Sequence, residues 1–427
     1  MENSDPFSNP SLKTWSTYVI GAQMLFVAFG ALVLIPIITG LDPSIALFTA
    51  GIGTIAFTFI TKAKVPVFLA SSFAFIAPIQ QSLEKYGYGE TFCGMASVGI
   101  VYILLSALIK WQGIEAVTRV LPPIVTGPVI MVIGLGLTPI ASDMAVSFDG
   151  SGTFNGQAAI LSAITASIAI AVALSKKRLL NLLPVLIAAG IGYLASIAFG
   201  VVDYTKVVEA PWIQLPWVAA TERGTFELPV WSLGAIIIFL PVAIVPAVEH
   251  VGDILAIQSV TKKNFVKDPG LHRTVLGDGI ATSLAGFLGG PPNTTYSEVT
   301  GAVALTKAYS VIYMRIGAIV SILLAFSGKL SAIFGTVPVP VMGGVMVVVF
   351  GMIAAVGLST IMKAKVDFDN PKNYIIFAVI MVVGVGKLTW QFGGFEIGGV
   401  GLAAILGILL NLILPSRPNN SNTEEEK

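Results

Sequence analysis

The stretch Val248-Glu-His-Val-Gly-Asp253 places ionisable side chains inside an apolar run, and Pro291-Pro-Asn-Thr-Thr-Tyr-Ser-Glu298 adds another acid next to a second apolar run. A charged side chain at the centre of a bilayer costs about 3 kcal/mol or more, so ionisable residues there mark a functional site. We therefore expect both stretches to lie deep in a membrane protein. In this interpretation, Glu249 and Glu298 hold a small polar solute halfway across the bilayer.

The composition is that of a membrane protein. The mean hydropathy is +0.87 and 11% of the residues are charged, whereas soluble domains carry about 25%. The net charge of +1 argues against a nucleic acid or another polyanion as partner. Cys93 is the single cysteine and the histidines are His250 and His272, so neither an internal disulfide nor a zinc-ligand set can be assembled. We expect no metal and no cofactor. The polar N-terminus lacks a basic region, so a cleaved signal peptide is not expected.

Twelve apolar runs approach the roughly 20 residues that a membrane-spanning helix needs. They cover residues 18–38, 44–60, 94–109, 124–140, 158–174, 182–199, 233–257, 275–288, 311–326, 341–358, 374–385 and 399–414. Two shorter segments, 65–79 and 296–304, are interrupted by polar residues or proline, and each lies between two good spans. Counting these segments as well predicts fourteen crossings, with both termini on one side.

The basic residues test this count, because Lys and Arg collect in cytoplasmic loops. One side of the predicted topology holds Lys62, Lys64, Lys110, Arg119, Lys176, Lys177, Arg178, Lys262, Lys263, Lys267, Arg273, Lys307, Lys363 and Lys365. The other side holds Lys85, Lys206, Arg223, Lys329 and Lys387. The sequence therefore predicts a multi-pass protein of the cell (inner, cytoplasmic) membrane with both termini in the cytoplasm.

An internal repeat accompanies this pattern. The stretch that begins Pro123-Ile-Val-Thr-Gly-Pro resembles the one that begins Pro340-Val-Met-Gly-Gly-Val, and the broken segments correspond as well, with Ser71-Ser72 opposite Ser297-Glu298. Two copies of seven spans have opposite orientations, and a broken helix at equivalent places in inverted repeats points to the binding site of a transporter. The alternative is that alternating Val and Gly in membrane helices imitate a repeat.

The acids of the first stretch can hold protons. Glu249 and Asp253 are four residues apart, so a helix places them on one face. Without a nearby Lys or Arg, carboxylates in an apolar site tend to stay protonated, as a proton-coupled carrier requires. We predict proton coupling by Glu249, Asp253, Glu298 and His250. Two alternatives stay open: Asp253 lies near the cytoplasmic end and is solvated, or His250 is simply a packed, hydrogen-bonded histidine.

The second stretch predicts a binding surface made partly of backbone. Prolines keep residues 291–295 out of a helix, and a half-helix starting near Tyr296 leaves its first N–H groups unpaired. Residues 70–75 offer the same feature from the other half. Such donors, together with carboxylate acceptors and an aromatic ring, suit a flat heterocycle with alternating N–H and C=O groups. The predicted substrate-binding residues are Glu249, Glu298, Phe73, Ser297, Tyr296 and Ser72.

Several motifs resemble those of the nucleobase–cation symporter-2 family, the nucleobase–ascorbate transporters, and within it the bacterial uracil permease branch. They are Ser71-Ser-Phe-Ala-Phe-Ile76, Glu249-His-Val-Gly252, Asp268-Pro-Gly-Leu-His-Arg273, Pro292-Asn-Thr-Thr-Tyr296 and Pro340-Val-Met-Gly-Gly344. The resemblance covers nearly the whole chain. It places Glu249 and Glu298 on the two substrate carboxylates of the family, and Phe73 and Ser297 on positions that give backbone N–H groups to the base.

The resemblance also implies a fold. It is an all-α polytopic membrane protein of fourteen segments in two inverted seven-span repeats, with short β-strands in the third and tenth segments. A core domain would comprise 16–110 and 229–335, and a gate domain 111–228 and 336–415. Residues 1–15 and 416–427 would be cytoplasmic tails. Members of the family are homodimers in which the core moves against the gate, coupled to protons.

Three departures from the family pattern bear on the substrate. Asp253 stands where the uracil branch usually has a histidine, Met24 stands where a histidine is common, and Ser297-Glu-Val-Thr replaces Gly-Glu-Asn. The leading prediction is a uracil–proton symporter that imports its substrate. The alternatives are a xanthine or other purine symporter, coupling to sodium, and an anion exchanger or channel of the same fold. A membrane-embedded enzyme is not expected, because no nucleophile–base pair or metal set is found.

Overall fold

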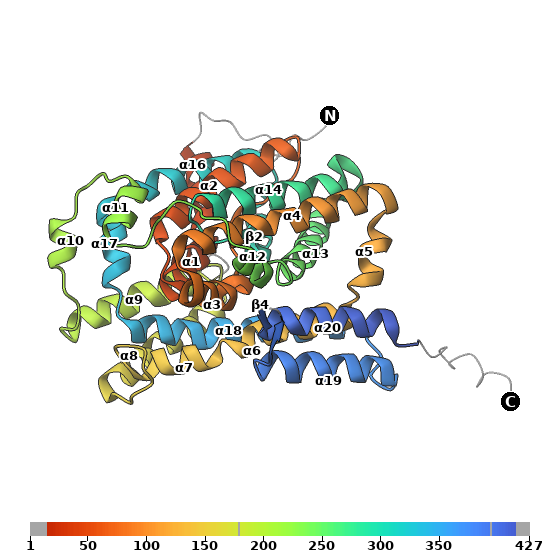
Figure 1. Ribbon diagram of the computed structural model, residues 1–427. Coiled ribbons are helices and arrows are strands. Elements are labelled where there is room, and N and C mark those ends of the chain that lie inside the picture. Colours follow the sequence, from red (N-terminus) through yellow and green to blue (C-terminus); the bar gives the residue numbers. More distant parts are fainter. Residues whose placement is uncertain (1–14, 178–179, 393–394, 416–427) are drawn as a thin grey trace.

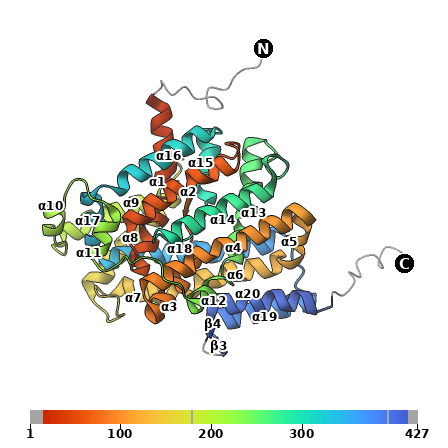
Figure 2. The same cartoon turned by 45° about the horizontal axis from the view of Figure 1, so that its top comes forward.

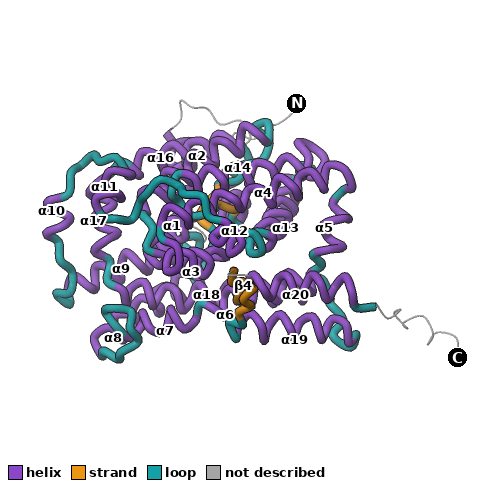
Figure 3. Tube along the Cα trace, viewed as in Figure 1, coloured by secondary structure: helices purple, strands orange, loops and turns teal. Residues whose placement is uncertain are grey.

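The computed structural model describes residues 15–177, 180–392 and 395–415. The predicted tails, 1–15 and 416–427, lie outside this part of the chain except for Trp15. Within it the protein is mainly helical, with two short two-stranded sheets (Figure 3).

Every predicted apolar run forms helix. Ten of the runs correspond to α1 (Trp15–Thr39), α2 (Pro43–Ile60), α4 (Tyr88–Gln112), α8 (Gly156–Ala173), α9 (Pro184–Ala198), α14 (Leu271–Phe287), α16 (Val311–Ala325), α18 (Val339–Lys363), α19 (Pro371–Val385) and α20 (Gly399–Ile413). The other two runs are divided, into α6 (Pro123–Gly136) with α7 (Thr138–Val146), and into α12 (Leu233–Phe239) with α13 (Ile244–Thr261).

Helix length alone gives fewer membrane crossings than the sequence pattern does. In the described ranges, six helices or near-continuous pairs are long and apolar enough to cross a bilayer, or seven when α12 and α13, bent by 41°, count as one span. Four further apolar helices, α9, α16, α19 and α20, are shorter. The protein is thus a multi-pass membrane protein, and fourteen crossings stay a prediction.

The two broken segments contain the predicted short strands. In the first, β1 (Leu69–Ser71) leads into a 3-10 turn, η1 (Phe73–Phe75), and α3 (Ile76–Tyr86). In the second, β2 (Asn293–Thr295) leads into α15 (Ser297–Thr306). The strands pair antiparallel across more than two hundred residues of chain, with Leu69 opposite Thr295. The expectation of short strands beside two half-helices is therefore confirmed.

The helices form two layers (Figures 1 and 2). The upper layer in Figure 1 holds α1 to α4 and α12 to α16, whereas the lower layer holds α6, α7 and α18 to α20. Within the upper layer α4 packs against α14 and α2 against α16, and in the lower layer α6 packs against α18.

Glycines permit the closest of these contacts. A Cβ atom added at Gly99 of α4 would lie 2.4 Å from the carbonyl oxygen of Gly279 in α14, and one at Gly279 would lie 2.3 Å from the Cβ atom of Tyr102. The two helix backbones therefore touch directly, as in small-residue packing between membrane helices.

Some elements were not predicted from the sequence. They are α5 (Ile114–Val120), α10 (Thr205–Glu209), α11 (Pro216–Glu222), α17 (Gly328–Thr336), the π-helical turn η2 (Val266–Gly270) and the hairpin of β3 (Thr389–Phe392) and β4 (Phe395–Gly398). At one edge of the molecule, the Lys329 ammonium group of α17 donates to the carbonyl oxygens of Val207 and Val208 in α10, at 2.8 and 2.7 Å.

Candidate solute-binding site

The two strands end at a junction whose backbone groups are paired inside the protein. The N–H of Ser72 donates to the carbonyl oxygen of Pro292 at 2.9 Å, just beyond the strand pair. The Thr282 hydroxyl donates to the carbonyl of Asn293 at 2.7 Å, and the Asn293 amide donates to the carbonyl of Thr49 at 3.2 Å. These bonds hold non-helical backbone at a depth where water is scarce, as membrane proteins require.

Asp253 anchors the start of α15 to α13. Its carboxylate accepts a hydrogen bond from the Thr295 hydroxyl at 2.7 Å and a second from the Ser297 hydroxyl. Only 4% of Asp253 is exposed. The alternative in which Asp253 is a solvated residue near the cytoplasmic end is therefore wrong.

Glu249 and Glu298 face the same region. Glu249 lies one turn before Asp253 on α13 and is half-buried, whereas Glu298 is the second residue of α15 and is exposed. Glu249 is close enough to Glu298 and Asp253 to be repelled electrostatically by both. In the ranges that the structure describes, no Lys or Arg forms an ion pair with these acids. Both glutamates come from the second half of the chain.

The first half of the chain contributes the other wall. Phe73 is half-buried, and its ring lies edge-on to Phe350 of α18 with centroids 6.4 Å apart. The Tyr296 hydroxyl donates to the carbonyl of Ser71 at 2.9 Å, so the two half-helix starts are linked. Phe73 and Ser297 are the first residues of their helical turns, and such residues have no helical partner for their N–H groups.

His250 is packed, as one of the two interpretations of it predicts, but neither ring nitrogen makes a well-directed hydrogen bond to a residue that the structure describes. It is completely buried, its Nδ1 lies 3.1 Å from Oδ2 of Asp278 in α14, and its ring lies edge-on to Phe57 at 6.2 Å. The partner, Asp278, is also completely buried and was not among the predicted site residues. The signal was available, because Asp278 is an acid inside the predicted span 275–288, and that rule had already selected Glu249.

Comparisons with known proteins identify the family of the chain. A family described as the permease family matches residues 15–392. The chain belongs to this family, the nucleobase–cation symporters. The permease is therefore a transporter and not an enzyme, which removes the membrane-embedded enzyme from the alternatives.

Relatives of the permease match over almost their full lengths. A probable uracil permease from Haemophilus influenzae is 48% identical over 94% of this chain and 94% of its own. The uracil permease of Bacillus caldolyticus is 41% identical over 96% and 94%, and that of Escherichia coli is 37% identical over 93% and 91%.

Solved structures share the fold at low sequence identity. The transmembrane domain of the cyanobacterial bicarbonate transporter BicA superposes with a TM-score of 0.63 at 14% identity, covering 93% of the permease and 97% of that chain. The murine anion transporter Slc26a9, in its inward-facing state, gives 0.65 at 10% identity, over 93% of the permease and 67% of that chain. These similarities concern the fold alone.

Proposed function

We propose that the permease imports uracil together with a proton across the cytoplasmic membrane. The observation that carries this proposal is that Glu249 and Glu298 lie close enough to interact electrostatically, next to the point where the two broken segments pair. The relatives include uracil permeases from several bacteria, which supports the choice of substrate.

In the proposed complex, the flat base lies at the ends of the two half-helices. The carboxylates of Glu249 and Glu298 accept the N–H groups of uracil, and the unpaired N–H groups of Phe73 and Ser297 donate to its carbonyl oxygens. The Phe73 ring covers one face of the base. Tyr296 and Ser72 hold this arrangement through their bonds to the opposite segment. Proton coupling is assigned to Glu249, Asp253 and Glu298, with His250 packed behind them.

The proposed movement is that of a core domain, 16–110 and 229–335, against a gate domain, 111–228 and 336–415. The two layers of Figure 1 support this division. In the proposed inverted seven-span repeats, α1 to α9 and α12 to α20, α14 is the counterpart of α2 and α16 is the counterpart of α4. The structure packs α2 against α16 and α14 against α4, so each repeat makes the same contact with the other, which supports the repeat. A homodimer with both termini in the cytoplasm completes the proposal.

Uptake of labelled uracil tests the function. Cells without their own permease should accumulate uracil when they express the wild type, and Glu249→Gln or Glu298→Gln should reduce the rate at least about tenfold, because each change removes a charge-assisted acceptor. Glu115→Gln is the matched control, since Glu115 is an exposed glutamate on α5. Full uptake by both site variants would exclude this assignment.

The coupling ion has its own test. A protonophore should abolish the accumulation of uracil while removal of sodium leaves it unchanged. The opposite result would make sodium the coupling ion.

A purine is the second candidate substrate, and Asp253 favours it because the uracil branch usually has a histidine there. A competition experiment tests this candidate. It is supported if excess xanthine suppresses uracil uptake while thymine and 5-fluorouracil do not.

An anion exchanger or channel would need a site without paired acids, so Glu249 and Glu298 count against it. Chloride-driven currents that ignore nucleobases would support that alternative.

A further inference from the structure

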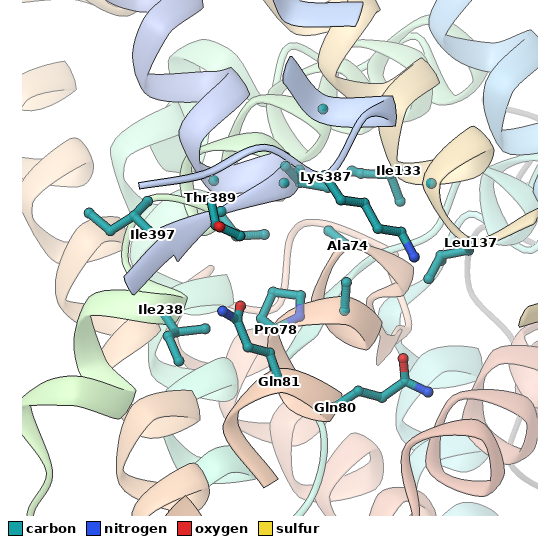
Figure 4. Close-up of a pocket in the computed structure, with 18 of the residues that line it drawn as sticks. Ala74, Pro78, Gln80, Gln81, Ile133, Leu137, Ile238, Lys387, Thr389 and Ile397 are labelled. Carbon is teal, nitrogen blue, oxygen red and sulfur yellow. The ribbon is translucent and has the colours of Figure 1, made fainter. Parts of the chain in front are cut away.

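A cavity of about 330 Å³ lies beside α3 (Figure 4), and Phe73 is one of the residues that line it. Its walls come from η1 and α3, from the end of α6, from α12, and from residues near β3 and β4, namely Gly384, Lys387, Thr389 and 397–401. Among the six predicted substrate-binding residues, only Phe73 lines it. The cavity is thus a separate chamber that meets the candidate site at one ring.

One face of α3 forms the length of this chamber. Phe73, Ala77, Gln81 and Glu84 line it and recur every three or four residues, as positions on one side of a helix do. At 1.5 Å per residue, the path from Phe73 to Glu84 is about 16 Å long. The face therefore leads from Phe73 toward the end of α3.

The opposite walls are apolar and belong partly to the other layer. Ile133 comes from α6 and Leu137 follows the end of that helix, whereas Ile238 comes from α12 and Val242 lies in the turn after it. Together with the Phe73 ring they offer surface for a flat, uncharged molecule. A volume of this size lies at the lower end of the range of about 300–1,000 Å³ for small-molecule pockets.

The polar groups of the chamber include two amides, those of Gln80 and Gln81. Gln80 donates to the carbonyl of Ile38 at 3.1 Å. The amide of Gln81, in contrast, makes no hydrogen bond to any residue that the structure describes, and Figure 4 shows it beside Pro78 and Ile238. An amide offers both donors and an acceptor, which complements the N–H and C=O edge of a nucleobase.

Two charged residues also line the chamber. Lys387 reaches across toward Leu137 in Figure 4, and Glu84 is the last residue of α3 that lines it. One cation and one anion leave the chamber without a net charge, so it does not select for an ion. Glu84 and Lys387 lie on the side of the predicted topology that is poor in Lys and Arg, so we expect this end of the chamber to face away from the cytoplasm.

We propose that the chamber is an outer waiting site for a neutral nucleobase, in which Gln81 binds the edge of the base before it passes Phe73 to reach Glu249 and Glu298. This inference rests on the proposed function, and it adds a second binding position and the residue that sets its preference. The base would dock here without help from the carboxylates.

Protection from thiol labelling tests the waiting site. In a Cys93→Ser background, Ala77→Cys on α3 and Gly136→Cys on α6 place a reporter thiol on each wall. Both positions have room for a cysteine, because Ala77 is exposed and a Cβ atom at Gly136 meets no other atom within 4 Å. A membrane-impermeant maleimide added outside intact cells should label both, and uracil should slow the labelling. The protection should persist when Glu249→Gln and Glu298→Gln are added.

Gln81→Leu should raise the uracil concentration for half-protection about tenfold, as expected for losing a buried hydrogen-bond partner. Thr153→Cys, in an exposed loop on the same predicted side, is the control whose labelling uracil should not change. Three results would overturn the waiting site. They are protection that disappears with the two glutamate changes, equal protection by ribose, and a Gln81→Leu variant that needs the same uracil concentration for half-protection as the wild type. Labelling only after permeabilisation would overturn its outer position. A wild type that takes up no uracil would instead overturn the proposed function.

Discussion

The hydroxyl of Thr295 donates to the carboxylate of Asp253 at 2.7 Å, and this bond joins the end of β2 to the middle of α13. The same carboxylate accepts from Ser297, the first residue of α15. Because Glu298 follows directly, the position of one proposed substrate carboxylate depends on Asp253. A change in the protonation of Asp253 would therefore act on the site through the half-helix that it anchors.

The first prediction separates these two contributions of Asp253. Asp253→Ala removes both acceptors and should lower uracil affinity at least about tenfold, since hydrogen bonds to charged groups contribute about 1.5–3 kcal/mol each. Asp253→Asn keeps one acceptor oxygen but cannot take up a proton. We expect Asp253→Asn to exchange labelled for unlabelled uracil across vesicles while losing accumulation driven by a pH gradient.

Thr295→Val is the matched control, because it removes one of the two bonds and leaves the carboxyl group able to titrate. It should weaken uracil binding and preserve accumulation driven by the gradient. An Asp253→Asn variant that still accumulates uracil against its gradient would show that Asp253 only positions α15.

Tyr296→Phe gives the second prediction. Its hydroxyl donates to the carbonyl of Ser71 at 2.9 Å, so the substitution removes the side-chain link between the two broken segments. A single neutral hydrogen bond contributes about 0.5–1.5 kcal/mol, so we expect the Kd for uracil to rise by about two- to tenfold. Isothermal titration of the purified protein measures this change. A Kd equal to that of the wild type would mean that the strand pair alone aligns the segments.

Much of this arrangement was predictable from the sequence because lipid restricts what a chain can do. Apolar runs of sufficient length had to form helices, and each expected run does. The polar interruption at residues 65–79 and the proline-containing stretch just before 296–304 had to satisfy their backbone groups, and they do so by pairing as β1 and β2. Glu249 and Glu298 were recognisable because an acid in an apolar stretch needs a reason to be there.

Other features depend on contacts that no local pattern reveals. Asp253 is buried because Thr295 and Ser297, more than forty positions away, donate to it. The short surface helices α10 and α17 meet through Lys329, which apolar periodicity does not mark. The outer chamber forms where α3 faces α6 and α12, and its walls become neighbours only in the folded protein.

The third prediction concerns His250 and Asp278. Both side chains are fully buried, with 3.1 Å between Nδ1 and Oδ2. Removing one partner leaves the other polar side chain buried without its neighbour, which costs about 1–3 kcal/mol. His250→Leu and Asp278→Leu should each lower the unfolding temperature strongly, whereas the double variant should be more stable than the sum of the two losses predicts. Thermal unfolding of the four proteins in detergent measures the coupling, and purely additive losses would contradict a direct interaction.

The fourth prediction tests the contact between α4 and α14 that supports the upper layer. Gly279→Ala would bring a Cβ atom to 2.3 Å from that of Tyr102, so the helices must separate, and overpacking of this kind costs about 1–3 kcal/mol. Gly190→Ala in α9 is the control, because a Cβ atom there meets nothing within 4 Å. Thermal unfolding should show a clear loss of stability for Gly279→Ala and little change for Gly190→Ala.

The same substitution should also weaken uracil binding. Helix α14 carries Asp278, and its Thr282 hydroxyl donates a hydrogen bond to the carbonyl of Asn293, so a shift of α14 disturbs the strand junction. A destabilised variant with unchanged affinity would show that the strand junction keeps its shape independently of this helix contact.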